Sequence, residues 1–133
     1  MLLFKKKFLA AIRGGEKTQT IRLWQYRRFK PGQRSYIPGA GYIDVERVEP
    51  IELEQLTDAD ALLDGFASAA ELRQELATLY PRELAAGYQP YRVVFRLLSP
   101  AEQQVCRDQR RAKLAAPLAE RAVPEKAPRK RGG

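Results

Sequence analysis

Residues 14–22 read GGEKTQTIR, and this stretch carries more information about fold and chemistry than any other in the chain. The glycine pair at its start is typical of a helix end, because glycine adopts the left-handed backbone conformation that often closes a helix. The β-branched residues that follow predict an extended or looped segment. If that segment is extended, its side chains alternate between two sides, with Thr18, Thr20 and Arg22 on one and Lys17, Gln19 and Ile21 on the other.

Helices and strands are expected on both sides of this stretch. Upstream, the spacing of Phe8, Leu9 and Ile12 predicts a short helix with one buried face. Downstream, alternating or β-branched patterns predict strands over residues 34–37, 42–48 and 91–98, with residues 51–53 as a further strand or a continuation. Capping residues predict helical segments that begin after Thr57 and after Ser68.

The chain of 133 residues has the length of one domain with a short appendage. We expect the domain over residues 1–98 and a charged helix over residues 99–115, with Ser99 as its cap. Residues 116–133 contain three prolines, five basic residues and no aromatic residue. This composition predicts a disordered basic tail, because it buries too little surface to offset the entropy of ordering.

The residue types that the chain lacks exclude several kinds of chemistry. There is no histidine and one cysteine, which excludes a disulfide framework, the usual zinc ligand sets and Ser-His-Asp or Cys-His catalysis. We therefore expect no metal and no cofactor, and acid–base chemistry must fall to Lys, Asp, Glu, Tyr or a hydroxyl. The absence of a long apolar run and of a secretory signal pattern predicts a cytoplasmic protein with no membrane partner.

The charged residues are segregated along the chain, although the net charge is only +8. Residues 1–40 hold ten Lys/Arg against one acid, residues 41–90 hold three against eleven, and residues 91–133 hold eleven against four. Such segregation favours a face that attracts a polyanion such as RNA. The alternative is an ordinary solvated surface on which charges of one sign happen to cluster.

Two short motifs carry the side chains best suited to chemistry. In a turn, Lys17 approaches Thr20 and acts as its base if burial or a second cation, such as Arg22, lowers the pKa of the lysine. Arg22 is also suited to holding an oxyanion or a phosphate. The second motif is Asp64-Gly65-Phe66, in which Asp64 is a candidate acidic partner for Lys17 or for a ligand amine. The alternatives are a solvated basic loop and an ordinary helix cap with Phe66 in the core.

Aromatic and basic residues are interleaved over residues 24–42, as in many single-stranded RNA contacts. The rings are those of Trp24, Tyr26, Phe29, Tyr36 and Tyr42, and we expect about two of the five to be exposed. The residues expected to contact RNA or a nucleoside are Lys17, Thr18, Thr20, Arg22, Trp24, Arg27 and Arg28.

Taken in order, these motifs resemble the ASCH (activating-signal-cointegrator homology) domain, a relative of the PUA fold. The resemblance covers roughly residues 2–98 and rests chiefly on the pair formed by residues 15–22 (GEKTQTIR) and Asp64-Gly65-Phe66. Supporting features are the apolar segment Phe4–Ile12, Phe29-Lys30-Pro31-Gly32, Leu56-Thr57, Leu79-Tyr80-Pro81 and the closing strand at 91–97. The resemblance implies an α+β, PUA-like small β-barrel with two or three helices packed at its openings.

The resemblance also implies two candidate functions. ASCH domains are generally regarded as RNA-binding or RNA-related, so the first is an RNA-binding module with a basic cleft around Lys17, Thr20 and Arg22. Some small bacterial members are N4-acetylcytidine amidohydrolases, which implies Thr20 as nucleophile, Lys17 as base and Asp64 as acidic partner. Asp64 stands where that subset has a glutamate and is one methylene shorter. Apart from the resemblance, a third candidate is a ribonuclease, since RNA cleavage needs a base, an acid and a phosphate clamp, and without histidine Lys17 would be the base.

Overall fold

The computed structural model describes residues 1–115 of the chain. Residues 1–98 form one unit, and a second unit begins at Ser99 with helix α5 (Pro100–Ala115). The tail expected over residues 116–133 lies outside the described residues. The candidate site described below belongs entirely to the first unit.

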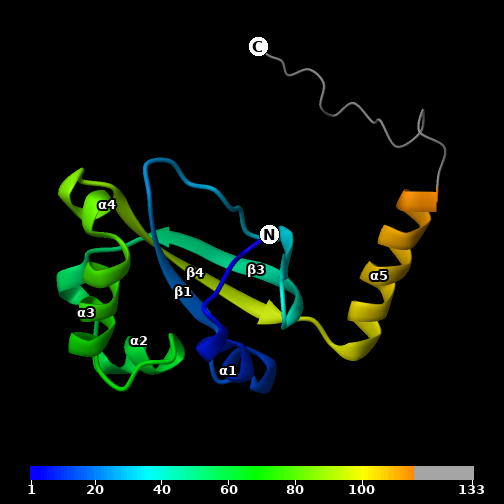
Figure 1. Ribbon diagram of the computed structural model, residues 1–133, viewed down its shortest axis with the longest axis horizontal. Helices are drawn as coiled ribbons and strands as arrows, with labels where there is room; N and C mark the ends of the chain where they lie inside the picture. Colours follow the sequence, from blue (N-terminus) through cyan, green and yellow to red (C-terminus); the bar gives the residue numbers. More distant parts are fainter. Residues whose placement is uncertain (116–133) are drawn as a thin grey trace, which may run out of the picture. The chain divides into compact units, whose positions relative to one another are not determined.

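The first unit is built on one curled sheet of four antiparallel strands (Figure 1). The strands are β1 (Gln19–Trp24), β2 (Arg34–Ile37), β3 (Gly41–Pro50) and β4 (Gln89–Leu97), in the spatial order β1-β4-β3-β2. Their positions confirm the strands predicted at 34–37, 42–48 and 91–98. The pairing of β3 with β4 shifts between Val45 and Arg47, and a bulge of this kind increases the local twist of a sheet.

Short helices precede β1 and fill the connection between β3 and β4. They are the 3-10 turns η1 (Lys6–Phe8) and η2 (Leu53–Gln55), and the α-helices α1 (Leu9–Gly14), α2 (Asp58–Leu63), α3 (Ala69–Leu79) and α4 (Pro81–Ala85). Both predicted caps are confirmed, since Thr57 accepts a hydrogen bond from the Asp60 amide and Ser68 accepts one from the Glu71 amide. The strand predicted at 51–53 is wrong. The ladder ends at the Pro50–Tyr91 pair. The Ile51 amide still donates to the Pro90 carbonyl, but proline has no N–H to donate back, and the chain turns into η2.

Strand β1 separates two apolar clusters, because its side chains alternate between the two faces of the sheet. Ile21 and Leu23 point toward α2 and α3 and join the buried residues Leu56, Ala61, Ala69, Leu72 and Leu76. On the other face, Trp24 packs against the main core, which consists of Leu2, Ile12, Phe29, Ile37, Ile43, Val45, Val48, Val93 and Phe95. Thr20 and Arg22, on the Trp24 side of the strand, are thereby held at the boundary between β1, the N-terminal segment and α3.

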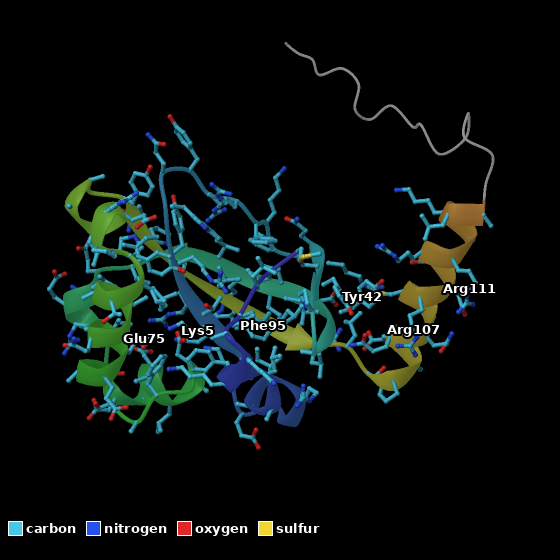
Figure 2. The ribbon with its side chains drawn as sticks, in the orientation of Figure 1. Lys5, Tyr42, Glu75, Phe95, Arg107 and Arg111 are labelled. Carbon is cyan, nitrogen blue, oxygen red and sulfur yellow. The ribbon has the colours of Figure 1, made fainter. Side chains whose placement is uncertain are left out.

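The N-terminal segment contacts both edge strands of the sheet. The Leu2 amide donates a hydrogen bond to the Tyr36 carbonyl of β2 over 3.0 Å, and the Leu3 carbonyl accepts one from Arg22 Nη2 of β1 over 2.7 Å. Phe4 then packs edge-on against Phe95 in the middle of β4, with ring centroids 5.9 Å apart. Figure 2 shows the Phe95 side chain standing on the sheet. The sheet and this segment together make a barrel-like wall, although the described residues contain no backbone ladder between β1 and β2.

Helix α5 begins with a reciprocal cap, in which the Glu102 amide donates to Ser99 Oγ and the Ser99 amide donates to Glu102 Oε1. Arg107 and Arg111 project from this helix (Figure 2), and Arg111 lies 3.1 Å from Asp108. In residues 1–115, no helix has the length and apolar character needed to cross a membrane. The cytoplasmic location expected from the sequence stays a prediction.

Candidate functional site

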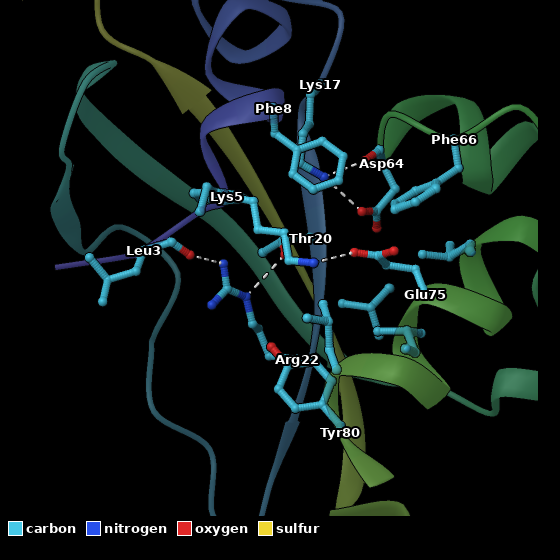
Figure 3. Close-up of a pocket in the computed structure, with 15 residues that line it drawn as sticks. Leu3, Lys5, Phe8, Lys17, Thr20, Arg22, Asp64, Phe66, Glu75 and Tyr80 are labelled. Carbon is cyan, nitrogen blue, oxygen red and sulfur yellow. Dashed lines mark hydrogen bonds and ion pairs between the residues drawn. The ribbon is translucent and has the colours of Figure 1, made fainter.

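A cavity of about 310 Å³ lies between the N-terminal segment, β1 and α3 (Figure 3). Its walls are mostly apolar, and its polar side chains are few. The lining comprises Leu3, Phe4, Lys5, Phe8, Lys17, Thr20, Ile21, Arg22, Asp64, Phe66, Leu72, Glu75, Leu76, Leu79 and Tyr80. An apolar hollow with a small number of converging polar groups is the usual form of a small-molecule site.

A buried ion pair between Lys17 and Asp64 forms the floor of this cavity. Lys17 Nζ lies 2.7 Å from Asp64 Oδ1 and also donates a hydrogen bond to the Asp64 carbonyl. The second carboxylate oxygen accepts a hydrogen bond from Gln19 Nε2 over 3.3 Å. The two charged side chains are only 2% and 4% exposed. Both oxygens of Asp64 are therefore occupied by donors of the protein itself.

Two glycines allow these two residues to meet. Gly15 closes α1 with a φ of +84°, after which the amides of Glu16 and Lys17 both bond back to the Ala11 carbonyl. Gly65 follows Asp64 at the end of α2 with a φ of +92°, where an added Cβ would contact Lys17 Cδ at 3.5 Å. The contact distance is an ordinary one, so it is the left-handed backbone conformation that favours glycine directly after the aspartate.

Burial changes the proton affinities of both members of the floor pair. Desolvation lowers the pKa of Lys17, and the nearby Arg22 charge lowers it further, while Asp64 opposes the shift. Desolvation raises the pKa of Asp64 against the opposing effects of Lys17, Gln19 and Arg22. Because the two shifts have opposite directions, the neutral forms of both side chains lie closer in free energy to the ion pair than they would in water.

Thr20 and Arg22 form the β1 wall of the cavity. Thr20 is buried, and its Oγ1 accepts a hydrogen bond from Arg22 Nε over 3.0 Å. The guanidinium group of Arg22 lies 4.8 Å from the centre of the Phe4 ring. Burial lowers the pKa of Arg22, with Tyr80 and Asp64 opposing the shift. Since a hydroxyl that accepts from one side keeps its own proton to donate, Thr20 remains able to donate to a base.

A second ion pair lies at the mouth of the cavity. Lys5 Nζ is 3.2 Å from Glu75 Oε2, and Lys7 Nζ is 3.7 Å from the same oxygen. The Lys5 side chain is 49% exposed and that of Glu75 is 18% exposed. Figure 3 shows this pair reaching across from the N-terminal segment to α3.

The structure brings together Lys17, Thr20, Arg22 and Asp64 among the residues singled out from the sequence. Thr18 does not line the cavity; its amide donates to the Leu63 carbonyl and its carbonyl accepts from the Phe95 amide. The remaining three, Trp24, Arg27 and Arg28, also lie outside the cavity.

Trp24 is the last residue of β1, and Arg27 and Arg28 lie in the loop that follows it. Trp24 is half-buried, with its ring 5.8 Å from that of Phe29 and 5.5 Å from that of Tyr91. Arg27 donates to the Val48 carbonyl over 2.6 Å. Arg28 and Trp24 line a separate shallow hollow of about 570 Å³, which shares Leu3 and Arg22 with the cavity as a common wall.

The expected exposure of the aromatic residues in this region is confirmed. Two of the five rings are exposed, Tyr26 at 76% and Tyr36 at 40%. Phe29 is buried, and Trp24 and Tyr42 are half-buried. Most of the interleaved aromatic pattern therefore serves packing in this unit.

Sequence reasoning missed Glu75 and Lys5 as members of the site. The leucines of α3 recur at Leu72, Leu76 and Leu79, and Glu75 falls on the same stripe of the helix. The sequence signal that could have identified Glu75 is an acidic residue on the apolar face of a helix. In residues 1–115, no group of three or more His, Cys, Asp or Glu side chains is placed to hold a metal ion.

Comparison with known proteins identifies the fold. No protein-family model matches the sequence, and no curated protein matches it. Solved structures do match, among them hypothetical protein PH0355, with a TM-score of 0.60 and 20% identity over 72% of this chain and 95% of that one. Protein EF3133 from Enterococcus faecalis V583, of family model DUF984, matches with a TM-score of 0.58 and 17% identity, and the match covers 69% of this chain and 67% of that one. The solution structure of PF0455 from Pyrococcus furiosus matches with a TM-score of 0.57 and 20% identity, and the match covers 73% of this chain and 94% of that one. At these identities the likeness shows that the chain shares an α+β fold with these small proteins.

Proposed function

We propose that the protein is an ASCH-type, PUA-like domain whose cavity binds a nucleoside and hydrolyses the N4-acetyl amide of acetylated cytidine. The observation that carries the proposal is the buried Lys17–Asp64 pair at the floor of a cavity that Thr20 also lines. The cavity lies at the small end of the range of ligand pockets, which suits one nucleoside better than a stretch of RNA. The sequence resemblance supplies the substrate class.

Thr20 is the nucleophile in this proposal, and Lys17 is its base. A lysine accepts a proton only in its neutral form, and burial together with the Arg22 charge makes that form more accessible by lowering the pKa of Lys17. Asp64 orients the amine of Lys17 through Oδ1. Because burial raises the pKa of Asp64, its carboxylate also shares the proton that Lys17 takes up. The shorter aspartate suffices because the local backbone brings it to 2.7 Å from the lysine.

The reaction proceeds through an acyl-enzyme intermediate. Thr20 Oγ1 attacks the acetyl carbonyl carbon while its proton passes to Lys17 Nζ, and the Arg22 guanidinium stabilises the oxyanion. The C–N bond then breaks, and the exocyclic nitrogen takes the proton from Lys17 to leave as the amine of cytidine. Water, deprotonated by Lys17, attacks the acetyl-threonine ester, which releases acetate and returns the proton to Thr20.

The test is release of acetate from N4-acetylcytidine by the purified protein and by a Lys17→Ala variant. We expect turnover in the wild-type protein and a loss of about a hundredfold or more in the variant. Lys30→Ala is a matched control, because it removes the same charge from an exposed position outside the cavity and should retain wild-type turnover. Full turnover by Lys17→Ala, or none by the wild-type protein, would contradict the proposal.

RNA binding without catalysis is the second candidate, and the separate hollow beside the cavity favours it. Arg28 and Trp24 line this hollow, and Arg22 lines both the hollow and the cavity. A cation and an aromatic ring therefore lie next to the cavity that would hold the nucleoside. The basic N-terminal third of the sequence supports the same proposal. Titration of a short single-stranded RNA at several salt concentrations tests it, because each released phosphate counterion steepens the fall of affinity with salt. Affinity that is flat from low to moderate salt would exclude this candidate.

A further inference from the structure

The cavity contains two carboxylates, and only one of them is available to a ligand. Both oxygens of Asp64 are bonded to protein donors, and its side chain is almost completely buried. Glu75 pairs through Oε2 alone, and within residues 1–115 its Oε1 has no hydrogen-bond partner. A ligand N–H that bonds to a carboxylate in this cavity therefore meets Oε1 of Glu75.

The partners of Glu75 are also easily displaced. Lys5 and Lys7 come from η1 and the residues before it, and their side chains are 49% and 57% exposed. An ion pair whose lysine lies largely in water contributes little to stability, because water solvates the ammonium group nearly as well as the carboxylate does. A ligand N–H can replace a lysine at Glu75 and leave that lysine in solvent.

We propose that Glu75 selects the base of the ligand by accepting a hydrogen bond from the exocyclic N–H of a cytosine. This inference rests on the proposed function, which places a cytidine derivative in the cavity. A carboxylate is the acceptor that suits the exocyclic amine of cytosine. An N4-acetylated cytosine keeps one such N–H, so the same contact serves the substrate and the deacetylated product.

The same carboxylate disfavours uracil. Uracil presents a carbonyl oxygen where cytosine presents its amine, and two acceptors facing each other in a largely apolar cavity are left without a proton between them. Thr20 on β1 and Glu75 on α3 line opposite walls of the cavity (Figure 3). With the amide between these walls, its carbonyl carbon faces the nucleophile and its N–H faces Glu75.

The experiment compares the affinities of cytidine and uridine by ligand-observed NMR titration, which needs no turnover. We expect the wild-type protein to prefer cytidine by about tenfold or more. Glu75→Gln should reduce the preference to about threefold or less, because the amide presents a donor to uracil as readily as an acceptor to cytosine. The variant keeps the size and shape of the side chain, and its melting temperature shows that it is folded.

Two controls separate base selection from a structural role. Lys5→Met removes the nearer lysine from Glu75 but leaves the carboxylate, so its preference for cytidine should be equal to that of the wild type or up to about threefold larger. Glu71→Gln changes an exposed acid one turn earlier on α3, outside the cavity, and should keep the wild-type preference. If Lys5→Met loses the preference as fully as Glu75→Gln does, the ion pair rather than the carboxylate determines selectivity and the inference is wrong.

Acetate release from N4-acetylcytidine, measured in parallel, separates this inference from the proposed function. Hydrolysis by the wild-type protein with an undiminished cytidine preference in Glu75→Gln would overturn the inference alone. Loss of preference in Glu75→Gln without wild-type hydrolysis would support a cytidine-selective site and overturn the catalytic proposal. A wild-type protein that binds neither nucleoside would overturn both.

Discussion

Two lysine–carboxylate pairs line the same cavity, and they differ in burial far more than in distance. At the floor, Lys17 and Asp64 are 2.7 Å apart and 2% and 4% exposed. At the mouth, Lys5 and Glu75 are 3.2 Å apart and 49% and 18% exposed. Burial removes water from the floor pair, which shifts both pKa values and makes each partner depend on the other. At the mouth the lysine keeps much of its water, so the pair gains less from its contact.

The difference assigns separate tasks to the two pairs. A lysine whose pKa is lowered and whose position is held by a buried carboxylate is suited to moving a proton. A carboxylate whose partners are solvated lysines is suited to exchanging them for a ligand. Chemistry at the floor and recognition at the mouth follow from how much water reaches each pair.

The largest effect is expected from the nucleophile beside the floor pair. Thr20→Ala should lower kcat for N4-acetylcytidine by about a thousandfold or more, because the variant lacks the attacking hydroxyl. Thr20→Ser keeps the hydroxyl and should retain measurable turnover. Cytidine affinity should change little in either variant, since the contacts at the mouth remain. A Thr20→Ala protein that keeps a tenth of wild-type turnover would show that the chemistry lies elsewhere.

Breaking each pair in turn should separate their contributions to stability. Lys17→Met leaves a buried carboxylate without its counter-ion and should lower the free energy of unfolding by about 3–5 kcal/mol. Lys5→Met should lower it by less than about 1 kcal/mol. Urea denaturation at pH 7 measures both. In Lys17→Met/Asp64→Leu no unpaired charge remains, so the loss should be smaller than in Lys17→Met alone.

The cost of Lys17→Met should also depend on pH. Burial already raises the pKa of Asp64, and removal of Lys17 removes the largest opposing effect, so the folded-state pKa rises further. A carboxyl group with a raised folded-state pKa stabilises the fold below its unfolded pKa and loses that contribution as pH rises through the folded one. The deficit relative to wild type should therefore grow from acidic to neutral pH. A deficit independent of pH would mean that Asp64 is not left as an unpaired charge.

One added or removed methylene should matter more at the floor than at the mouth. Asp64→Glu forces an extra methylene into a site where the side chain is 4% exposed and already reaches Lys17, and overpacking of this kind costs about 1–3 kcal/mol. Glu75→Asp shortens a side chain near solvent and should cost about 0.5 kcal/mol or less. Thermal denaturation of both variants measures the contrast. An Asp64→Glu protein as stable as wild type would show that the floor has spare room.

Local patterns predicted the elements well because their causes are local. Thr57 and Ser68 cap helices through bonds to amides three residues away, so a short window of sequence contains the whole interaction. The strand at 51–53 was wrong because its end depends on the residue that lies opposite it in β4, and Pro90, which has no N–H to donate, is far along the chain from Ile51. The contact of Leu2 with β2 is non-local in the same way.

The candidate site was predictable in its residues but only partly in its geometry. Lys17, Thr20 and Arg22 share a short window, and their grouping followed from spacing. Asp64 lies 47 residues from Lys17, so the sequence made it a candidate partner of the lysine but could not show that the two residues meet. Glu75 was missed because a helical stripe of leucines indicates a core face, and the sequence does not show that this face borders a cavity rather than another side chain.

The smallest effect should appear in ligand affinity at the mouth. Lys5→Met frees Glu75 from its nearer partner, and because such a pair is worth less than about 1 kcal/mol, cytidine should bind about two- to threefold more tightly. Salt also weakens the Lys5–Glu75 pair by screening it. A higher salt concentration should therefore improve the affinity of the wild-type protein for cytidine slightly and that of Lys5→Met less. Nucleoside titrations at two salt concentrations measure this.

RNA held through its phosphates would respond in the opposite direction, since salt weakens that contact. The sign of the salt effect therefore separates exchange at one carboxylate from attraction to a polyanion.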